Sequence, residues 1–486
     1  MPKANQHKPC PPEDELRPHL EHYYHLGLND EKIANYCLEH FDKDVYGLSI
    51  SSVKRYRKKW NLLKTRQQKH TIASISDSVD KIKKRFPNRG AGSITSALRL
   101  EENIRVPRDT VLAYLKQVEP AAVAARKHKK FVRRRFWAAG IHDIWAIDQH
   151  DKMKRFGLYL HVGLDPFSGL ILWCKIWWTN HNPRLITSFY IEAARRLKAV
   201  PLITQSDPGT ENFGVANAHT TIRQRLDPSL AGTLQHRWMR EHQNIKPEIH
   251  WSILRKDWAP GFEDILEQGV ENGWYDINIL MEKHLFRWLA IPWLQRELDA
   301  WVRQRNTTPR RADKHKILPH GIPELINEKP RHFNSEDFKI PVSEDLLDEV
   351  ENIWAPRDHA VFELVPPAFS HRVNQCYAAI GQPVLTSDTF WDIYLDLLRE
   401  LRPTLQDPTF QEMLMEHAPI EEAAKAEEIG LLAGQQDLRP GPAMIGHQAL
   451  GMAADNAAEA GSIYGDFTDT EDDEGDLVEE EDEGLL

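Results

Sequence analysis

A series of short apolar segments in the middle of the chain constrains the fold most strongly. The segments "IWAIDQH" (144–150), "LYLHVGLD" (158–165) and "LILWCKIWW" (170–178) are rich in β-branched and aromatic residues, as strands are. A helical pattern that starts at Pro183 follows them, and a fourth apolar segment, "PLITQSD", spans 201–207. Three strands, a helix and a further strand predict an α/β domain with a mixed sheet that is covered by helices.

Two aspartates within these segments are unusual for buried strands. Asp148 lies inside the first segment, where a charged group is costly unless it is paired or bound to a metal ion. Asp207 ends the fourth segment, and Pro208 and Gly209 turn the chain away directly after it. If the two strands are neighbours in the sheet, both carboxylates lie at one edge. Adjacent carboxylates repel and raise the pKa of one of them, unless a cation with oxygen ligands keeps both ionised.

Four segments together carry a resemblance to a known family. "AIDQHDK", "GLDPFSG", "SDPGTEN" and "NIKPEIHW" resemble the catalytic core of retroviral-type integrases and DDE transposases, and most closely the integrase-core proteins of eukaryotic genomes. The resemblance covers residues 120–325. It implies a ribonuclease H-like fold, in which helices flank a mixed sheet.

The resemblance also implies the catalytic residues. The Asp-Asp-Glu triad of the family corresponds to Asp148, Asp207 and Glu248, and an acidic helix of the form Asn-x-x-x-Glu-x-x-Trp runs from Asn244 to Trp251. Asp207 and Glu248 are 41 positions apart, which is close to the spacing in retroviral-type integrases. Proline is favourable at the first position of a helix. The proline before Glu248 is therefore expected to begin this helix.

Each of the three acids also has a simpler interpretation. Asp148 would be a structural buried acid, Asp207 would form an Asp-Pro-Gly turn, and Glu248 would be an acid on a helix surface. Three further glutamates compete for the last position of the triad: Glu241, Glu263 and Glu267.

The chemistry that the resemblance implies is direct phosphoryl transfer on DNA. Two Mg²⁺ or Mn²⁺ ions about 3.5–4 Å apart would bracket the scissile phosphate. Asp148, Asp207 and Glu248 would be their ligands, and no covalent protein nucleophile would be needed. We expect a homo-oligomer when the protein is active, because strand transfer at two DNA ends needs at least a dimer. No small-molecule substrate is expected.

The charges of the chain are distributed very unevenly. Residues 1–135 contain 29 Lys or Arg against 15 Asp or Glu, whereas residues 464–486 contain twelve Asp or Glu and no Lys or Arg. A basic front and an acidic tail predict a polyanionic partner at one end and a solvated tail at the other. The net charge of −10 therefore hides a basic, DNA-compatible front.

Two groups of short helices are predicted in this basic front. Residues 15–66 read as three helices of a helix-turn-helix unit, and residues 72–120 as a second such unit or a winged fold. Basic residues crowd the third helix of the first unit, and we predict that they bind DNA: Lys54, Arg55, Arg57, Lys58 and Lys59. The alternative is a basic, solvated face of a small helix bundle.

Five further residues are predicted to contact DNA. Arg133, Arg134 and Arg135 belong to a basic linker at 121–138, which would bind phosphates or serve as a nuclear-localisation patch. The other two are near the predicted triad: Lys152 and Asn212.

The remaining parts of the chain complete the predicted domain organisation. We predict disorder at 1–14, the integrase catalytic core at 139–325, a helical region of unknown role at 326–430, and a disordered acidic tail at 431–486. The four cysteines form no CxxC pair, and neither a signal peptide nor a membrane span is apparent. These features predict a nuclear or cytoplasmic protein that is not secreted and has no membrane partner.

Three functions are therefore open at this level. The first is an integrase or transposase-type enzyme, derived from a transposable element, that cuts and joins DNA. The second is a domesticated, non-catalytic DNA-binding protein, which is favoured by Gly169 and Ile249, because close relatives have arginine at these positions. The third is a nuclease of the same fold that hydrolyses strands without joining them.

Overall fold

The structure is a computed structural model that describes residues 8–126, 138–239, 244–310 and 318–438. The chain divides into two compact units. The described part of the first lies within residues 1–130, and the described part of the second within residues 131–468.

The first unit contains two successive groups of three longer helices. The first group is α1 (Glu13–His25), α2 (Asp30–Leu38) and α3 (Ile50–Lys59), and the short α4 (Thr65–Gln68) follows it. The second group is α5 (Ile72–Arg85), α6 (Ala91–Glu101) and α7 (Arg108–Val118), followed by α8 (Pro120–Arg126). No strand occurs within residues 8–126, so the segment 72–120 contains no wing.

Side-chain caps set where the helices of the first group begin. The Asn29 side chain accepts a hydrogen bond from the Lys32 backbone N–H, and the Ser49 hydroxyl accepts one from Ser52. Helix α1 begins at Glu13, and the backbone N–H of Gly47 donates to Pro9 O at 2.9 Å. The disorder that was predicted for residues 1–14 is therefore wrong for residues 8–14, because these residues are tied to the helical group.

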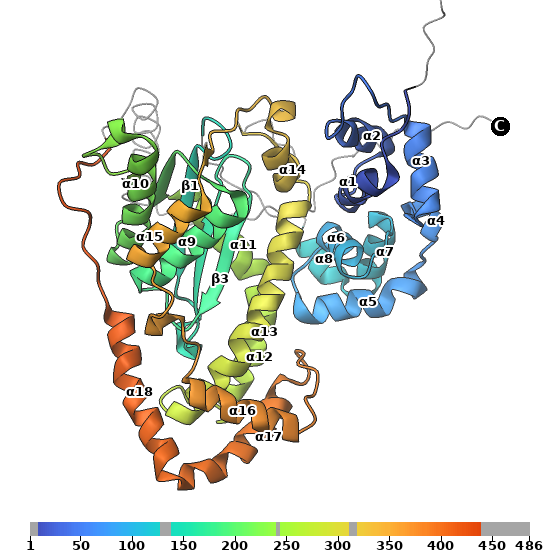
Figure 1. The fold of residues 1–486 in the computed structure, drawn as a ribbon. Helices are drawn as coiled ribbons and strands as arrows, with labels where there is room; N and C mark the ends of the chain where they lie inside the picture. Colours follow the sequence, from blue (N-terminus) through green and yellow to red (C-terminus); the bar gives the residue numbers. More distant parts are fainter. Residues whose placement is uncertain (1–7, 127–137, 240–243, 311–317, 439–486) are drawn as a thin grey trace, which may run out of the picture. The chain divides into compact units, whose positions relative to one another are not determined.

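The second unit is built on a five-stranded mixed sheet with the order β3-β2-β1-β5-β6. Strands β1 (Ile144–His150), β2 (Tyr159–Leu164) and β3 (Ile171–Trp177) form an antiparallel meander. Strands β5 (Ile203–Ser206) and β6 (His236–Trp238) continue the sheet in parallel with β1. This is the ribonuclease H-like arrangement that was predicted, with helices on both faces of the sheet (Figure 1).

One face of the sheet carries the main hydrophobic core. The side chains of Trp145 and Ile147 on β1 pack there against α9 (Pro183–Leu197), α10 (Phe213–Leu226) and α15 (Glu344–Trp354). Helix α9 begins at Pro183, as predicted, and the Asn182 side chain caps it by accepting from the backbone N–H groups of Arg184 and Leu185. The odd-numbered positions of β1 therefore form the apolar face of the domain.

The opposite face is covered by α11 (Ile245–Asp257) and the long helix α13 (Leu280–Thr307), with α12 (Ala259–Glu271) between them in the chain. Two amides of α13 pair with the outer edge of β3. Gln295 bonds both Ile176 N and Cys174 O, and Asn306 bonds the backbone N–H and C=O of Ile171. These amides satisfy backbone groups that an edge strand would otherwise leave open.

The segment after the predicted integrase core continues the same unit. It contains α14 (Pro323–Glu328), α15, α16 (Pro367–Ala379), α17 (Phe390–Leu401) and α18 (Pro408–Ala426), and a short strand β7 (Ile340–Pro341) pairs with β4 (Ala199–Val200). Leu347 and Val350 of α15 are fully buried in the core that β1 and α9 form. Residues 326–430 are therefore packed onto the core and do not form a separate region.

The described chain ends in an extended segment, residues 427–438, that we call the C-terminal strap. It leaves α18 and runs beside α10 (Figure 1). Glu427 pairs with Arg184 at 2.8 Å, Asn217 donates to Gly430 O at 2.8 Å, and Gln436 exchanges backbone hydrogen bonds with Leu234 and Gly232. Residues 431–438 of the tail that was predicted to be disordered thus have definite partners.

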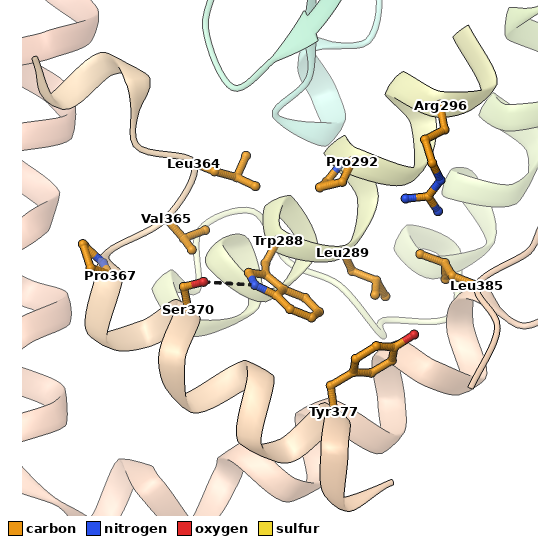
Figure 2. Close-up of a pocket in the computed structure, with 10 residues that line it drawn as sticks. All are labelled: Trp288, Leu289, Pro292, Arg296, Leu364, Val365, Pro367, Ser370, Tyr377 and Leu385. Carbon is orange, nitrogen blue, oxygen red and sulfur yellow. Dashed lines mark hydrogen bonds between the residues drawn. The ribbon is translucent and has the colours of Figure 1, made fainter. Parts of the chain in front are cut away.

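A pocket of about 520 Å³ lies between α13, α16 and the segment that precedes α16. Figure 2 shows its apolar lining, which includes Pro292, Val365 and Tyr377, with Trp288 Nε1 donating to Ser370 Oγ at 3.3 Å. None of the three predicted triad residues lines it. Among the described residues, no helix is long and apolar enough to cross a membrane.

Candidate active site

Asp148 and Asp207 lie at the same level of the sheet. Strands β1 and β5 are parallel neighbours, and Ala146 is opposite Gln205. Two residues further along each chain are Asp148 and Asp207, so both acids lie at the carboxyl-terminal edge of these two strands. The prediction that the two strands are neighbours is confirmed by this pairing.

Helix α11 carries the third acid, Glu248, on the face of the helix that is directed to this edge of the sheet. The fully buried Asn244, directly before the helix, donates to Ile147 O at 2.9 Å and accepts from Gln205 Nε2 at 3.3 Å, so it ties the helix to both strands. Glu248 and Trp251 follow at the fourth and seventh positions, on the same face. Trp251 Nε1 donates to Asp148 Oδ2 at 2.9 Å.

The helix begins two residues earlier than the sequence suggested. Its first residue is Ile245, so Pro247 is the third helical residue and not the first. The first four N–H groups of a helix have no partner within it, so proline is tolerated there as well. Glu248 still lies in the first turn, where the helix dipole stabilises a negative charge.

The electrostatics show that the acids influence one another. Burial raises the pKa of Asp148 to about 8, and the negative charge of Asp207 adds to this effect. The charge of Glu248 acts in the same direction more weakly, whereas the Trp251 hydrogen bond lowers the pKa. An acid with so high a pKa is largely protonated at neutral pH, and a nearby cation would favour its ionised form. The oxygen-only donor set therefore fits a hard divalent cation.

The carboxylates converge without closing tightly around one point. Among the described residues, a different group of three possible ligands has its donor atoms within 4.8 Å of one another. It consists of His284, His417 and Glu421. The charges of Asp207 and Glu248, which add to the effect of burial on the pKa of Asp148, also oppose closer approach of the three acids.

The turn after Asp207 is tied to the end of β1. The buried Asn212 donates to Asp207 O at 3.3 Å and to Glu211 Oε1 at 3.1 Å, and the Gln149 amide donates to the same Glu211 oxygen. Sequence reasoning missed the Gln149–Glu211 contact, because it joins the end of β1 to the turn after β5, 62 positions further along the chain. Since the Asn212 side chain is fully buried, its predicted DNA contact is not part of the function proposed below.

Nearby histidines and the rival glutamates have structural partners. The ring of His150 stacks on Trp251 with 4.8 Å between the centroids, and burial lowers its pKa to about 4. The fully buried His161 accepts from Trp173 Nε1. Glu263 pairs with Arg255, and Glu267 pairs with Arg155. The remaining rival, Glu241, lies outside the described residues.

Most of the basic residues that were predicted to bind DNA are exposed. This holds for Lys152, two residues after the end of β1, and for four residues of α3: Lys54, Arg55, Lys58 and Lys59. Arg57 of α3 differs, because its side chain is only 5% exposed and pairs with the buried Asp30 at 2.7 Å. Arg57 is therefore not available to contact DNA. Arg133, Arg134 and Arg135 lie outside the described residues.

Comparison with known protein families agrees with this geometry. Residues 136–322 match the family model of the integrase core domain, which supports membership of this part of the chain in the integrase core family. Such domains are typically polynucleotidyl transferases that act on nucleic acid and generally use divalent metal ions. A comparison with curated proteins finds no match.

Proposed function

We propose that this protein cuts and joins DNA strands by phosphoryl transfer, with Asp148, Asp207 and Glu248 as ligands of two Mg²⁺ or Mn²⁺ ions. The observation that carries the proposal is the level placement of Asp148 and Asp207 on neighbouring parallel strands. Burial raises the pKa of Asp148, and the charges of Asp207 and, more weakly, Glu248 add to this effect. Such a group of acids in an integrase core domain is suited to binding divalent cations.

The chemistry of the bound ions would be to increase the nucleophilicity of a water molecule or a DNA 3′-hydroxyl and to stabilise the leaving oxygen. The residues around the acids position them for this task. Trp251 orients Asp148 through one carboxylate oxygen, and Asn244 fixes the start of α11 to β1 and β5. The Gln149–Glu211 contact holds the turn after Asp207 against the end of β1.

DNA binding by the first unit is the second part of the proposal. The exposed side chains of Lys54, Arg55, Lys58 and Lys59 give α3 a basic surface that suits the phosphate backbone. Lys152 would contact DNA beside the carboxylates. We further propose that the protein acts as a homo-oligomer, in the nucleus or the cytoplasm, and that it derives from a transposable element.

A non-catalytic DNA-binding protein is the second candidate function. One observation favours it. Gly169 has φ +71° and lies directly against the guanidinium of Arg310, which donates to Gly169 O. An arginine at position 169, as in close relatives, would require the Arg310 guanidinium to shift and a left-handed backbone that side chains rarely adopt, which favours divergence of this part of the chain. A nuclease that hydrolyses without joining is the third candidate.

A strand-transfer assay with Mg²⁺ and labelled DNA separates the three functions. The enzyme proposal predicts joined product from the unaltered protein and none from Asp207→Asn. The exposed Asp358 provides the control variant Asp358→Asn, which should retain the activity. Cleavage without joining would identify the nuclease, and metal-independent DNA binding with neither product would identify the binding protein.

A further inference from the structure

A second group of possible metal ligands lies far from the carboxylates in the sequence. His284 of α13 and His417 and Glu421 of α18 each have a donor atom, and these atoms all lie within 4.8 Å of one another. His417 and Glu421 are four positions apart on one helix, so they lie on the same face. His284 comes from the neighbouring helix and faces them, with its ring 5.8 Å from that of His417.

The most unusual member of the cluster is His284. Its side chain is fully buried, and neither ring nitrogen has a hydrogen-bond partner among the described residues. A buried polar atom without a partner loses its hydrogen bonds to water, so such atoms call for an explanation. Burial lowers the pKa of His284 to about 3, and the ring is therefore neutral, which is the form that binds metals.

His417 is oriented in the way that is typical of a metal ligand. Its Nε2 lies 3.4 Å from Glu363 Oε2, and its Nδ1 is buried without a hydrogen-bond partner among the described residues. A histidine that ligates a metal usually donates its other ring N–H to a carboxylate, which fixes the ring and increases its basicity. Glu363 supplies that carboxylate and leaves the lone pair of the buried Nδ1 available to a metal ion.

Glu421 also keeps one oxygen available. Its Oε1 pairs with Arg287 at 2.7 Å and with Lys283 at 3.1 Å, whereas Oε2 is buried and has no hydrogen-bond partner among the described residues. These two cations hold the pKa of Glu421 below its usual range against the opposing effect of burial, so the carboxylate is ionised. Together with Glu363, Glu421 balances both cations, and the cluster carries no net charge that would repel an added ion.

We propose that His284, His417 and Glu421 bind one Zn²⁺ ion that ties α18 to α13. Two imidazoles and one carboxylate form a zinc ligand set, with a fourth position for water. Nitrogen ligands favour zinc over Mg²⁺ or Ca²⁺, which prefer oxygen. Zinc bonds of about 2.0–2.2 Å place ligand atoms roughly 3–4 Å apart, so the side chains need to approach by about 1 Å.

Zinc titration of the full-length protein tests this proposal. The protein is prepared as Asp148→Asn/Asp207→Asn, so that the carboxylate site does not compete for the ion, and its zinc affinity is measured against a chromophoric chelator. We expect one tightly bound Zn²⁺ per chain. Loss of the Glu363 carboxylate in Glu363→Gln should weaken the affinity about 10–100-fold, because it only orients a ligand. His417→Ala should weaken it further.

Two controls make the result decisive. His371→Ala removes an exposed histidine of α16 outside the cluster and should bind zinc normally. The thermal midpoint should rise with zinc in the parent protein and not in His417→Ala, provided that both show the same far-ultraviolet circular dichroism. The proposal would be overturned if the parent protein bound no Zn²⁺ tightly. It would also be overturned if His417→Ala and Glu363→Gln both bound zinc with the same affinity as the parent. A buried water at His284 would then be the remaining explanation.

Discussion

The two groups of possible metal ligands in the second unit differ in chemistry and in construction. Asp148, Asp207 and Glu248 provide only oxygen atoms, they lie at the edge of a sheet, and their charges act against one another. The cluster of His284, His417 and Glu421 provides nitrogen and oxygen, and it lies between two helices. Carboxylates that repel one another and stay apart suit hard ions that exchange and that also bind a substrate. A compact group of ligands without net charge suits a single ion that stays bound.

The strongest test of this comparison is Asp207→Asn. Metal ions stabilise the transition state by several kcal/mol, and about 4 kcal/mol corresponds to roughly 10³ in rate. We therefore expect strand transfer to fall about 10³-fold, while zinc binding at the histidine cluster is unchanged. Gel assays and zinc titration of the same preparation measure both effects. Activity within a few-fold of the unaltered protein would remove Asp207 from the reaction.

Glu421→Gln should have the next largest effect, and this effect is on stability. Arg287 and Glu421 are 8% and 3% exposed, so the substitution leaves a buried guanidinium without its ionised partner. Breaking such a pair typically costs about 3–5 kcal/mol. Urea unfolding in the presence of a chelator measures the loss, and Glu422→Gln, which alters the exposed neighbouring acid, is the control. Equal urea midpoints would show that the carboxylate does not stabilise the helix pair.

Trp251→Phe should have a smaller effect that is confined to the carboxylates. It removes the hydrogen bond to Asp148 Oδ2 and keeps an aromatic ring. A hydrogen bond to a charged group contributes about 1.5–3 kcal/mol, so the Mg²⁺ concentration for half-maximal activity should rise about tenfold or more.

The control for this prediction is Trp258→Phe. Trp258 is fully buried, and its indole N–H has no hydrogen-bond partner among the described residues. It should leave the Mg²⁺ dependence unchanged even if it lowers stability. If both tryptophan variants shift the Mg²⁺ dependence equally, general loosening of the fold and not the orientation of Asp148 is the cause.

Lys58→Ala should produce the smallest effect and should leave both ligand groups unaffected. Loss of one phosphate contact reduces the slope of log affinity against log salt concentration by about 1, and it does so for all DNA sequences alike. Fluorescence anisotropy at several salt concentrations measures the slope. Lys32→Ala, on the exposed side of α2, is the matched control. Identical slopes for the two variants would argue against α3 as the DNA-binding surface.

Much of the sheet could be predicted from the sequence, because its signals are local. The apolar segments gave β1, β2, β3 and β5 with small errors at their ends, and Pro183 marked the first residue of α9. The start of α11 was misplaced by two residues, because the first turn of a helix tolerates proline at several positions. Strands β4 and β7 have two residues each and produce no periodic signal.

The candidate site was only partly predictable. Asp148 and Asp207 follow from acids placed in apolar strands, but Glu248 depended on the resemblance to integrases. The histidine cluster could not be recognised, since His284 and His417 are separated by 133 positions and a lone histidine in a helix is most often a packing residue. The burial of Arg57 was also hidden, because only the fold reveals its pairing with Asp30.

The C-terminal strap has a practical consequence for how the protein can be divided. The family match ends at residue 322, yet Leu347 and Val350 complete the core of the sheet, and Gln436 pairs with the backbone just before β6. A fragment truncated at 322 would expose that apolar face to water and would tend to precipitate during expression. Recombinant versions of the second unit should therefore extend to at least residue 438.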